Sequence, residues 1–132
     1  MRAARTALAG LALSALAAVT TASPLPPAAR AEVNALMTRM QTVGCDFNRN
    51  GSWYSGADAT GHLLKKLDYF EGKDEVHSAE QFIERAATGS MMSGKPYLVR
   101  CTGKPTLEMR PWLLGELSGI RAARSAPASS PR

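Results

Sequence analysis

One dipeptide, Asn50-Gly51, constrains the fold of this chain more than any other local feature. Asparagine and glycine are the residues that most readily adopt the positive φ angles of a two-residue type I′ turn. Short β-prone runs flank the pair, which indicates a β-hairpin. A two-residue turn also fixes the register, so we expect Phe47 opposite Tyr54 on one face of the sheet.

The chain contains two cysteines, Cys45 before the hairpin and Cys101 much later. Residues 97–101 predict a strand with Tyr97, Val99 and Cys101 on one face, so the thiols can meet if this strand joins the hairpin. We therefore predict a Cys45–Cys101 disulfide. It closes a loop of about 57 residues and is worth about 4 kcal/mol in the chain-entropy model. No Cys-x-x-Cys pattern supports a redox or metal pair instead.

The N-terminus has the order of segments that is typical of a secretory signal peptide. Arg2 and Arg5 form a cationic start, residues 6–19 carry no charge, and residues 20–22 are small enough for a cleavage site. We predict a signal peptide over residues 1–22, one globular domain over 23–121, and a disordered tail over 122–132. This organisation predicts a periplasmic protein with no stable membrane anchor after cleavage, in a compartment where disulfides form.

The formal net charge of +5 on 132 residues comes from the two ends of the chain. Without Arg2, Arg5, Arg121, Arg124 and Arg132, the basic residues number 11 and equal the acidic ones. A nucleic-acid-binding domain usually carries a basic patch or stripe. Because the acidic and basic residues in the central part of the chain are equal in number, we expect no nucleic-acid partner.

Four segments have the apolar spacing and the end signals of amphipathic helices. Pro27 or Ala28 opens the first and Gly44 follows it. Ser55 and Ser78 are N-cap residues, and Pro111 opens the last. A loop is expected over residues 102–110. The predicted fold is α+β, with about four helices packed on a small antiparallel sheet that consists of the Asn-Gly hairpin and one later strand.

Two stretches resemble cofactor-binding motifs but lack residues that the chemistry needs. Residues 89–96 are similar to a phosphate-binding P-loop, but Pro96 replaces the magnesium-binding hydroxyl, and the segment is expected to join a helix to a strand. Residues 46–51 are similar to the start of a calcium loop, but Ala57 replaces its bidentate glutamate. We therefore expect no cofactor and no metal.

Four sequence blocks, taken together and in order, carry a family resemblance. They are Phe47-x-Arg49-Asn50-Gly51-x-x-Tyr54, Ala59-x-x-His62-Leu63-x-x-Lys66, Ala79-Glu80-Gln81-Phe82-Ile83 and Ser93-Gly94-Lys95-Pro96-Tyr97. This combination resembles the YfeK-like family of small exported proteobacterial proteins of unknown function. The resemblance covers roughly residues 30–120 and implies a periplasmic location but no activity.

These blocks hold more polar residues than a core requires. We expect some of them to converge in a network that serves either fold specificity or ligand capture. The candidate binding residues are Arg49, Asn50, Tyr54, His62, Lys66, Glu80, Ser93, Lys95 and Tyr97.

The function predicted from these residues is that of a non-enzymatic binding or interaction domain, and we assign no catalytic residue. Its surface combines the Asn-Gly hairpin with the turn of residues 93–97, and its partner is a periplasmic protein or a small anionic ligand. The alternative is a small periplasmic hydrolase that uses His62 with Tyr54 or Glu80, although no spacing ties these residues into a triad. A third hypothesis is metal handling by His62 with Met91 or Met92.

Overall fold

A computed structural model describes residues 3–4, 6–15 and 24–127 of the chain. Residues 3–4 and 6–15 form no helix or strand, and the predicted cleavage site after Ala22 lies outside the described residues. Within those three ranges, none of the helices is long and apolar enough to cross a membrane.

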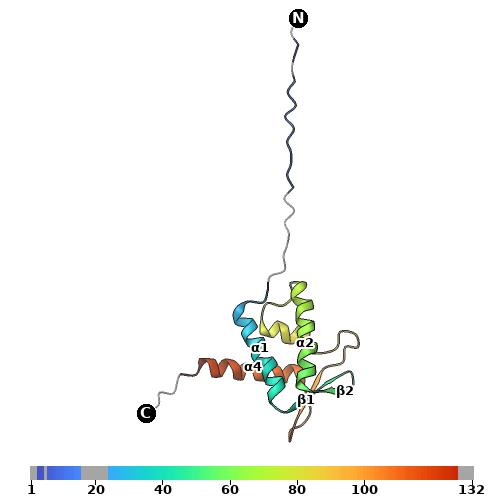
Figure 1. The fold of residues 1–132 in the computed structure, drawn as a ribbon, viewed down its shortest axis with the longest axis vertical. Coiled ribbons are helices and arrows are strands. Elements are labelled where there is room, and N and C mark those ends of the chain that lie inside the picture. Colours follow the sequence, from blue (N-terminus) through green and yellow to red (C-terminus); the bar gives the residue numbers. More distant parts are fainter. Residues whose placement is uncertain (1–2, 5, 16–23, 128–132) are drawn as a thin grey trace.

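The described residues form an α+β fold with four helices and an antiparallel sheet of four strands, which confirms the predicted class (Figure 1). The strands gather at one end of α1 and α2, in the order β2-β1-β3-β4. The helices are α1 (Pro27–Thr42), α2 (Gly56–Gly72), α3 (Ala79–Ala86) and α4 (Met109–Ser125). The strands are β1 (Cys45–Arg49), β2 (Ser52–Tyr54), β3 (Leu98–Cys101) and β4 (Leu107–Glu108).

The hairpin forms in the register that the sequence predicts. Asn50 and Gly51 both have positive φ angles, of 51° and 85°, as a type I′ turn requires. Phe47 lies opposite Tyr54 across the β1–β2 pair. This register matters for the site, because it places Arg49 on the same face of the sheet as Phe47 and Tyr54.

The disulfide between Cys45 and Cys101 is present, and it joins the two central strands where these residues face each other in register. One strand, β4, was not predicted, since we expected a loop over residues 102–110. It pairs with the other edge of β3, so the helix after it begins at Met109 rather than Pro111. A proline is tolerated there, because backbone N–H groups in the first turn of a helix have no partner within the helix.

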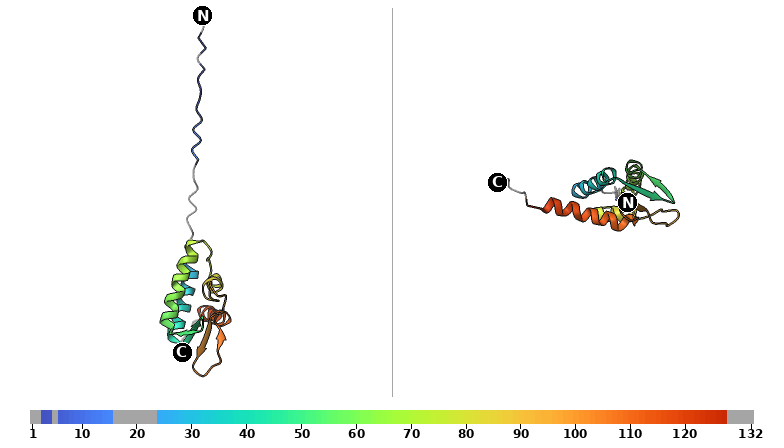
Figure 2. Two further views of the ribbon diagram at one scale, coloured as in Figure 1. Left: turned by 90° about the vertical axis from the view of Figure 1, so that its right-hand side faces the viewer. Right: turned by 90° about the horizontal axis from the view of Figure 1, so that it is seen from below.

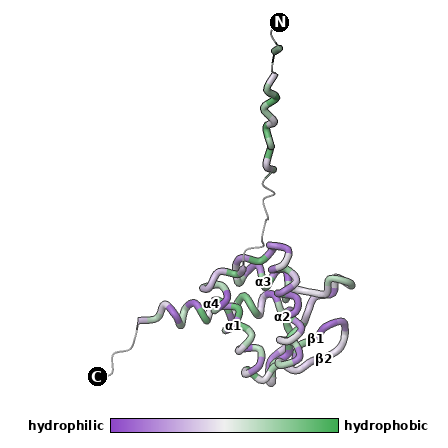
Figure 3. Tube along the Cα trace, turned by 45° about the horizontal axis from the view of Figure 1, so that its top comes forward, coloured by the Kyte–Doolittle hydropathy of each residue, from purple (hydrophilic) through white to green (hydrophobic). Residues whose placement is uncertain are grey.

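The core fills the space between the helices and one face of the sheet. α1 and α2 lie side by side, and α3 packs against both (Figure 2). Hydrophobic and hydrophilic stretches alternate along each helix (Figure 3), as expected for helices with one buried face. Phe47, Leu36, Phe82 and Leu113 are among the fully buried side chains. Met40 is also buried.

The last helix extends further than the sequence indicated. Residues 122–125, which we expected in a disordered tail over 122–132, continue α4, and residues 128–132 lie outside the described residues. Ion pairs explain the extension: Arg121 donates to both carboxylate oxygens of Glu32 on α1, at 2.7 and 2.9 Å, and Arg124 donates to one of them at 3.3 Å. The composition of the tail gave no sign of this partner.

Candidate functional site

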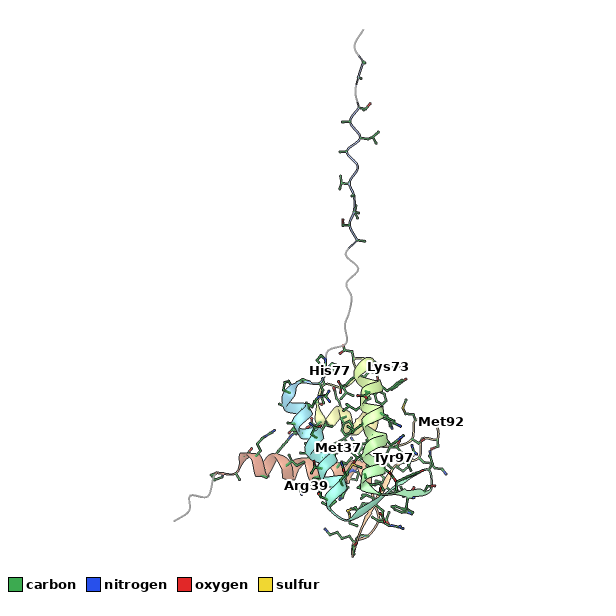
Figure 4. All side chains as sticks on the ribbon, viewed as in Figure 1. Met37, Arg39, Lys73, His77, Met92 and Tyr97 are labelled. Carbon is green, nitrogen blue, oxygen red and sulfur yellow. A yellow bond between two sulfur atoms is a disulfide. The ribbon has the colours of Figure 1, made fainter. Side chains whose placement is uncertain are left out.

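A cavity of about 450 Å³ lies where the N-terminal half of α2 faces the hairpin. Its walls come from β1, β2, α2, the residue before β3 and the first residue of α4. Figure 4 shows Tyr97 at this place, where α2 meets the sheet, whereas His77 lies at the opposite end of α2. The polar residues that line the cavity include Arg49, Tyr54, Asp58, His62, Lys65 and Tyr97.

Arg49, at the end of β1, connects the hairpin to α2. Its Nη1 atom lies 2.7 Å from Nδ1 and 3.1 Å from Nε2 of His62, and its Nη2 donates to the Tyr54 hydroxyl at 3.4 Å. The guanidinium also lies over the Tyr54 ring, 5.0 Å from its centroid. At least two of its five N–H groups have no acceptor among the described residues, so they are available to a ligand.

His62 is a neutral acceptor in this arrangement. A guanidinium only donates hydrogen bonds, so the ring nitrogen that receives the 2.7 Å contact must carry a lone pair. Burial, followed by the positive charges of Arg49, Lys66 and Lys65, holds the pKa of His62 below its usual value. With Nδ1 as the acceptor, the ring proton is on Nε2 and faces the Tyr97 hydroxyl at 3.3 Å.

Tyr97 and Lys66 form the inner part of the site, and both are buried. The Lys66 ammonium donates to the Tyr97 hydroxyl and to the carbonyl of Gly89, each at 3.0 Å. Gly89 is required at its position, since an added Cβ would lie 2.8 Å from the carbonyl oxygen of Lys95. With the His62 proton assigned to Nε2, the Tyr97 hydroxyl receives hydrogen bonds from Lys66 and His62, and its own phenol proton has no acceptor in this network.

The ionisation of these groups reflects an environment that is apolar and positive. Burial, with the charge of Arg49 added, lowers the pKa of Lys66 to about 8. Burial raises the pKa of the Tyr97 hydroxyl, which stays a neutral donor. The pKa of Tyr54 shifts the other way, because the hydrogen bond from Arg49 stabilises its phenolate.

The charges around the cavity are unbalanced. Neither Arg49, Lys65 nor Lys66 forms an ion pair with any described residue. Asp58 is the acidic residue that lines the cavity; it is exposed in the first turn of α2, where its backbone N–H donates to the Ser55 side chain. Cations that are partly removed from water without a carboxylate partner are costly to the fold.

Five of the nine predicted site residues meet around this cavity: Arg49, Tyr54, His62, Lys66 and Tyr97. Two others make a separate contact, in which the Ser93 hydroxyl donates to the Asn50 side chain at 2.7 Å and so connects the 90–94 turn to the hairpin. Lys95 is exposed and does not line the cavity.

Glu80 is not brought to the cavity. It lies on α3 and forms an ion pair with Arg121 of α4. Sequence reasoning in turn missed Asp58 and Lys65, which line the cavity. Their positions are four residues before and three residues after His62, so helical periodicity could have placed them on the face of His62.

The two methionines considered for a metal site are exposed. Met91 and Met92 are 60% and 99% exposed, and Figure 4 shows Met92 at the outer edge of the molecule, away from the helices. Among residues 3–4, 6–15 and 24–127, no three His, Cys, Asp or Glu side chains are placed to hold a metal ion together.

Comparisons with known proteins identify the family. The model of the "Family of unknown function (DUF5329)" matches residues 27–121, and the chain belongs to this family. The chain is also similar to "Uncharacterized protein YfeK" of Salmonella typhimurium, with 35% identity over 68 residues, which are 51% of this chain and 55% of that protein. The chain thus matches about half the length of that relative, and no solved structure matches it. These matches confirm the resemblance to a YfeK-like family of unknown function.

Proposed function

We propose that this member of a family of unknown function is a non-enzymatic binding protein that captures a small anionic ligand in the cavity between α2 and the hairpin. The observation that carries the proposal is the convergence of Arg49, His62, Lys66 and Tyr97, in which no carboxylate of the described residues binds the two cations. A ligand anion supplies the missing negative charge. The oxygens of the ligand accept hydrogen bonds from the N–H groups of Arg49 and the O–H group of Tyr97.

The hydrogen bonds inside the site support ligand binding, because they pre-orient donors rather than consume them. His62 and Tyr54 hold the Arg49 guanidinium from two sides, and Lys66 with His62 holds the Tyr97 hydroxyl. Side chains that are fixed before binding lose less conformational entropy when the ligand arrives. The site thus has the features of a preorganised anion receptor.

The surroundings of His62 argue against the hydrolase alternative. A histidine base must become positively charged when it takes a proton, and the adjacent Arg49 and Lys66 charges disfavour that state. The hydroxyl that contacts His62 is the buried Tyr97 phenol, whose pKa is raised, rather than an activated serine or cysteine. Glu80, one of the two predicted partners, is held by Arg121.

Calorimetric titration tests the binding function. The full chain is titrated with sodium acetate, sodium octanoate and inorganic phosphate, alongside Arg49→Gln and the control Arg100→Gln. Arg100 is on the neighbouring strand β3 and pairs with Asp46 outside the cavity. We expect saturable binding of at least one anion, at least tenfold weaker binding by Arg49→Gln, and unchanged binding by Arg100→Gln. The absence of saturable binding by every probe, or undiminished binding by Arg49→Gln, refutes the proposal.

We also propose that the protein is exported to the periplasm with a signal peptide over residues 1–22. The disulfide between Cys45 and Cys101 supports this location, since such bonds persist in oxidising compartments. The test is mass spectrometry of the chain from a periplasmic extract, after thiol alkylation without reductant. The expected species begins at Ser23 and carries no alkyl group on either cysteine. A cytosolic species that begins at Met1 with two alkylated cysteines contradicts export.

A further inference from the structure

We infer that the ligand is an amphiphilic monocarboxylate, an organic acid with one carboxylate group and an apolar body. This inference rests on the proposed anion-binding function and specifies the class of ligand. It follows from three properties of the cavity: the order in which apolar and polar side chains line it, its net charge, and its size.

The charged side chains that line the cavity are more exposed than its large apolar ones, and the buried lining is apolar apart from Asn48 and Tyr97. Phe47, Leu63 and Met109 are between 1% and 2% exposed and form an apolar wall. Arg49, in contrast, is half-buried, and Lys65 is exposed. A ligand that satisfies both parts inserts an apolar body and leaves its charged group near Arg49, because apolar surface gains free energy when it leaves water.

The net charge of the lining favours a single negative charge on the ligand. With His62 neutral, Arg49 and Lys65 against Asp58 leave a formal charge of +1. A polyanion would meet the Asp58 carboxylate at the mouth with too few cations to compensate it. A monoanion balances the lining, and the buried Lys66 ammonium behind Tyr97 adds further attraction.

The donors also match a carboxylate. The Arg49 guanidinium keeps N–H groups free and can bind two oxygens of one carboxylate in a fork. The Tyr97 phenol proton, which lacks an acceptor within the network, supplies a further donor from the cavity wall. An alcohol or amine ligand would bring additional donors to a site that already has a surplus of them.

Size separates an organic acid from an inorganic ion. The cavity of about 450 Å³ lies within the range of sites for organic ligands, roughly 300–1,000 Å³. It corresponds to about fifteen water molecules at their volume in the liquid. A single inorganic anion at Arg49 would leave the apolar wall of Phe47, Leu63 and Met109 in contact with water.

Titration with acids of increasing chain length tests this inference. The full chain is titrated with acetate, butanoate, hexanoate and octanoate, and in parallel with inorganic phosphate and octanamide. We expect the dissociation constant to fall about fourfold per added methylene until the cavity is filled. Octanamide, which keeps the apolar body but has no charge, should bind at least tenfold more weakly than octanoate. Phosphate should also bind more weakly than octanoate.

A variant that narrows the cavity gives an independent measurement. Ala59 lines the cavity from α2 and is partly buried, so Ala59→Leu reduces the space for the apolar body. Octanoate binding should weaken at least tenfold while acetate binding is unchanged, with folding checked by the thermal midpoint. If this variant does not fold, the chain-length series on the unaltered protein decides the question.

The outcomes separate the ligand class from the proposed function. Arg49-dependent binding of acetate or phosphate with no gain on lengthening the chain overturns the monocarboxylate class and leaves anion capture intact. No saturable binding of any anion refutes both. Equal binding of octanamide and octanoate, with no loss in Arg49→Gln, also refutes both, because the charge of the ligand would then play no part.

Discussion

Two charged side chains are buried among the described residues, and their surroundings are opposite in character. Between α1 and α4, the buried Glu32 carboxylate accepts hydrogen bonds from Arg121 and Arg124, at 2.7–3.3 Å. Beside the cavity, the buried Lys66 ammonium donates to two neutral oxygens, a backbone carbonyl and the Tyr97 phenol. The first charge has two partners of opposite sign, and the second has none among the described residues.

The pKa of each group shows what this difference means for the fold. Hydrogen bonds from Arg121 lower the pKa of Glu32 despite its burial, so folding favours the charged form. Burial lowers the pKa of Lys66, so folding disfavours its charged form. Glu32 therefore connects two helices and stabilises the fold, whereas Lys66 costs stability at neutral pH. A costly buried cation directly behind Tyr97, which lines the cavity, is more readily explained by ligand binding than by stability.

Removal of the compensated charge should have the largest effect. Glu32→Gln removes the carboxylate that Arg121 and Arg124 share, and Arg121 keeps its ion pair with Glu80. We expect the free energy of unfolding at pH 7 to fall by about 1–3 kcal/mol. The measurement is urea denaturation followed by circular dichroism. The control is Glu84→Gln, which breaks the exposed pair of Glu84 with Arg110 and should cost less than about 1 kcal/mol. Equal losses in the two variants would show that the Glu32 pair is no stronger than a surface pair.

The charge of Lys66, which has no carboxylate partner among the described residues, should affect the free energy of unfolding at alkaline pH. The pKa of Lys66 is about 8 in the folded protein against 10.5 as its ordinary value, so between these values the unfolded chain binds more protons. The free energy of unfolding should therefore rise with pH, by about 1–2 kcal/mol from pH 8 to about 9.5, at about 1.4 kcal/mol per pH unit for a fully released proton.

Variants of two adjacent lysines identify the source of this rise. Lys66→Met should remove the increase between pH 8 and about 9.5, and Lys65→Met should keep it, because Lys65 is exposed on the same helix. Urea denaturation at several pH values measures both. A flat profile in the unaltered protein, or a rise that persists in Lys66→Met, would contradict the assignment to Lys66.

The parts of the molecule that depend on local chemistry were predictable from the sequence. Asn50-Gly51 specifies its turn and hence the register of β1 and β2, and the Ser55 and Ser78 side chains cap the helices that they were expected to open. The disulfide followed because two cysteines had one possible pairing within the chain. These features depend on neighbouring residues or on a count of one residue type.

The parts of the molecule that depend on partners distant in the sequence were not predictable in this way. From the sequence, Glu80 is a candidate for the polar network. In the structure it pairs with Arg121 of α4, and the sequence contains no signal for that pairing. The strand β4 has two residues and is defined by its pairing with the edge of β3, which lies several residues earlier in the chain. The convergence of Arg49 with His62 and Tyr97 is of the same kind, since it requires the packing of α2 on the sheet. Periodicity predicts the faces of helices but not which faces meet.

The smallest expected effect is a change in the pKa of His62. It measures how strongly the cations without carboxylate partners act on this side chain. Burial and the charges of Arg49, Lys66 and Lys65, in that order, hold the pKa of His62 below its usual value. Arg49→Gln should therefore raise the pKa of His62 more than Lys66→Met does, and Lys65→Met should raise it least. Proton NMR titration of the imidazole signals gives the three values. If the order is reversed, Arg49 is not the main source of the positive field at His62. If the pKa of His62 is insensitive to all three changes, the positive field that the anion-binding proposal requires is absent from the cavity.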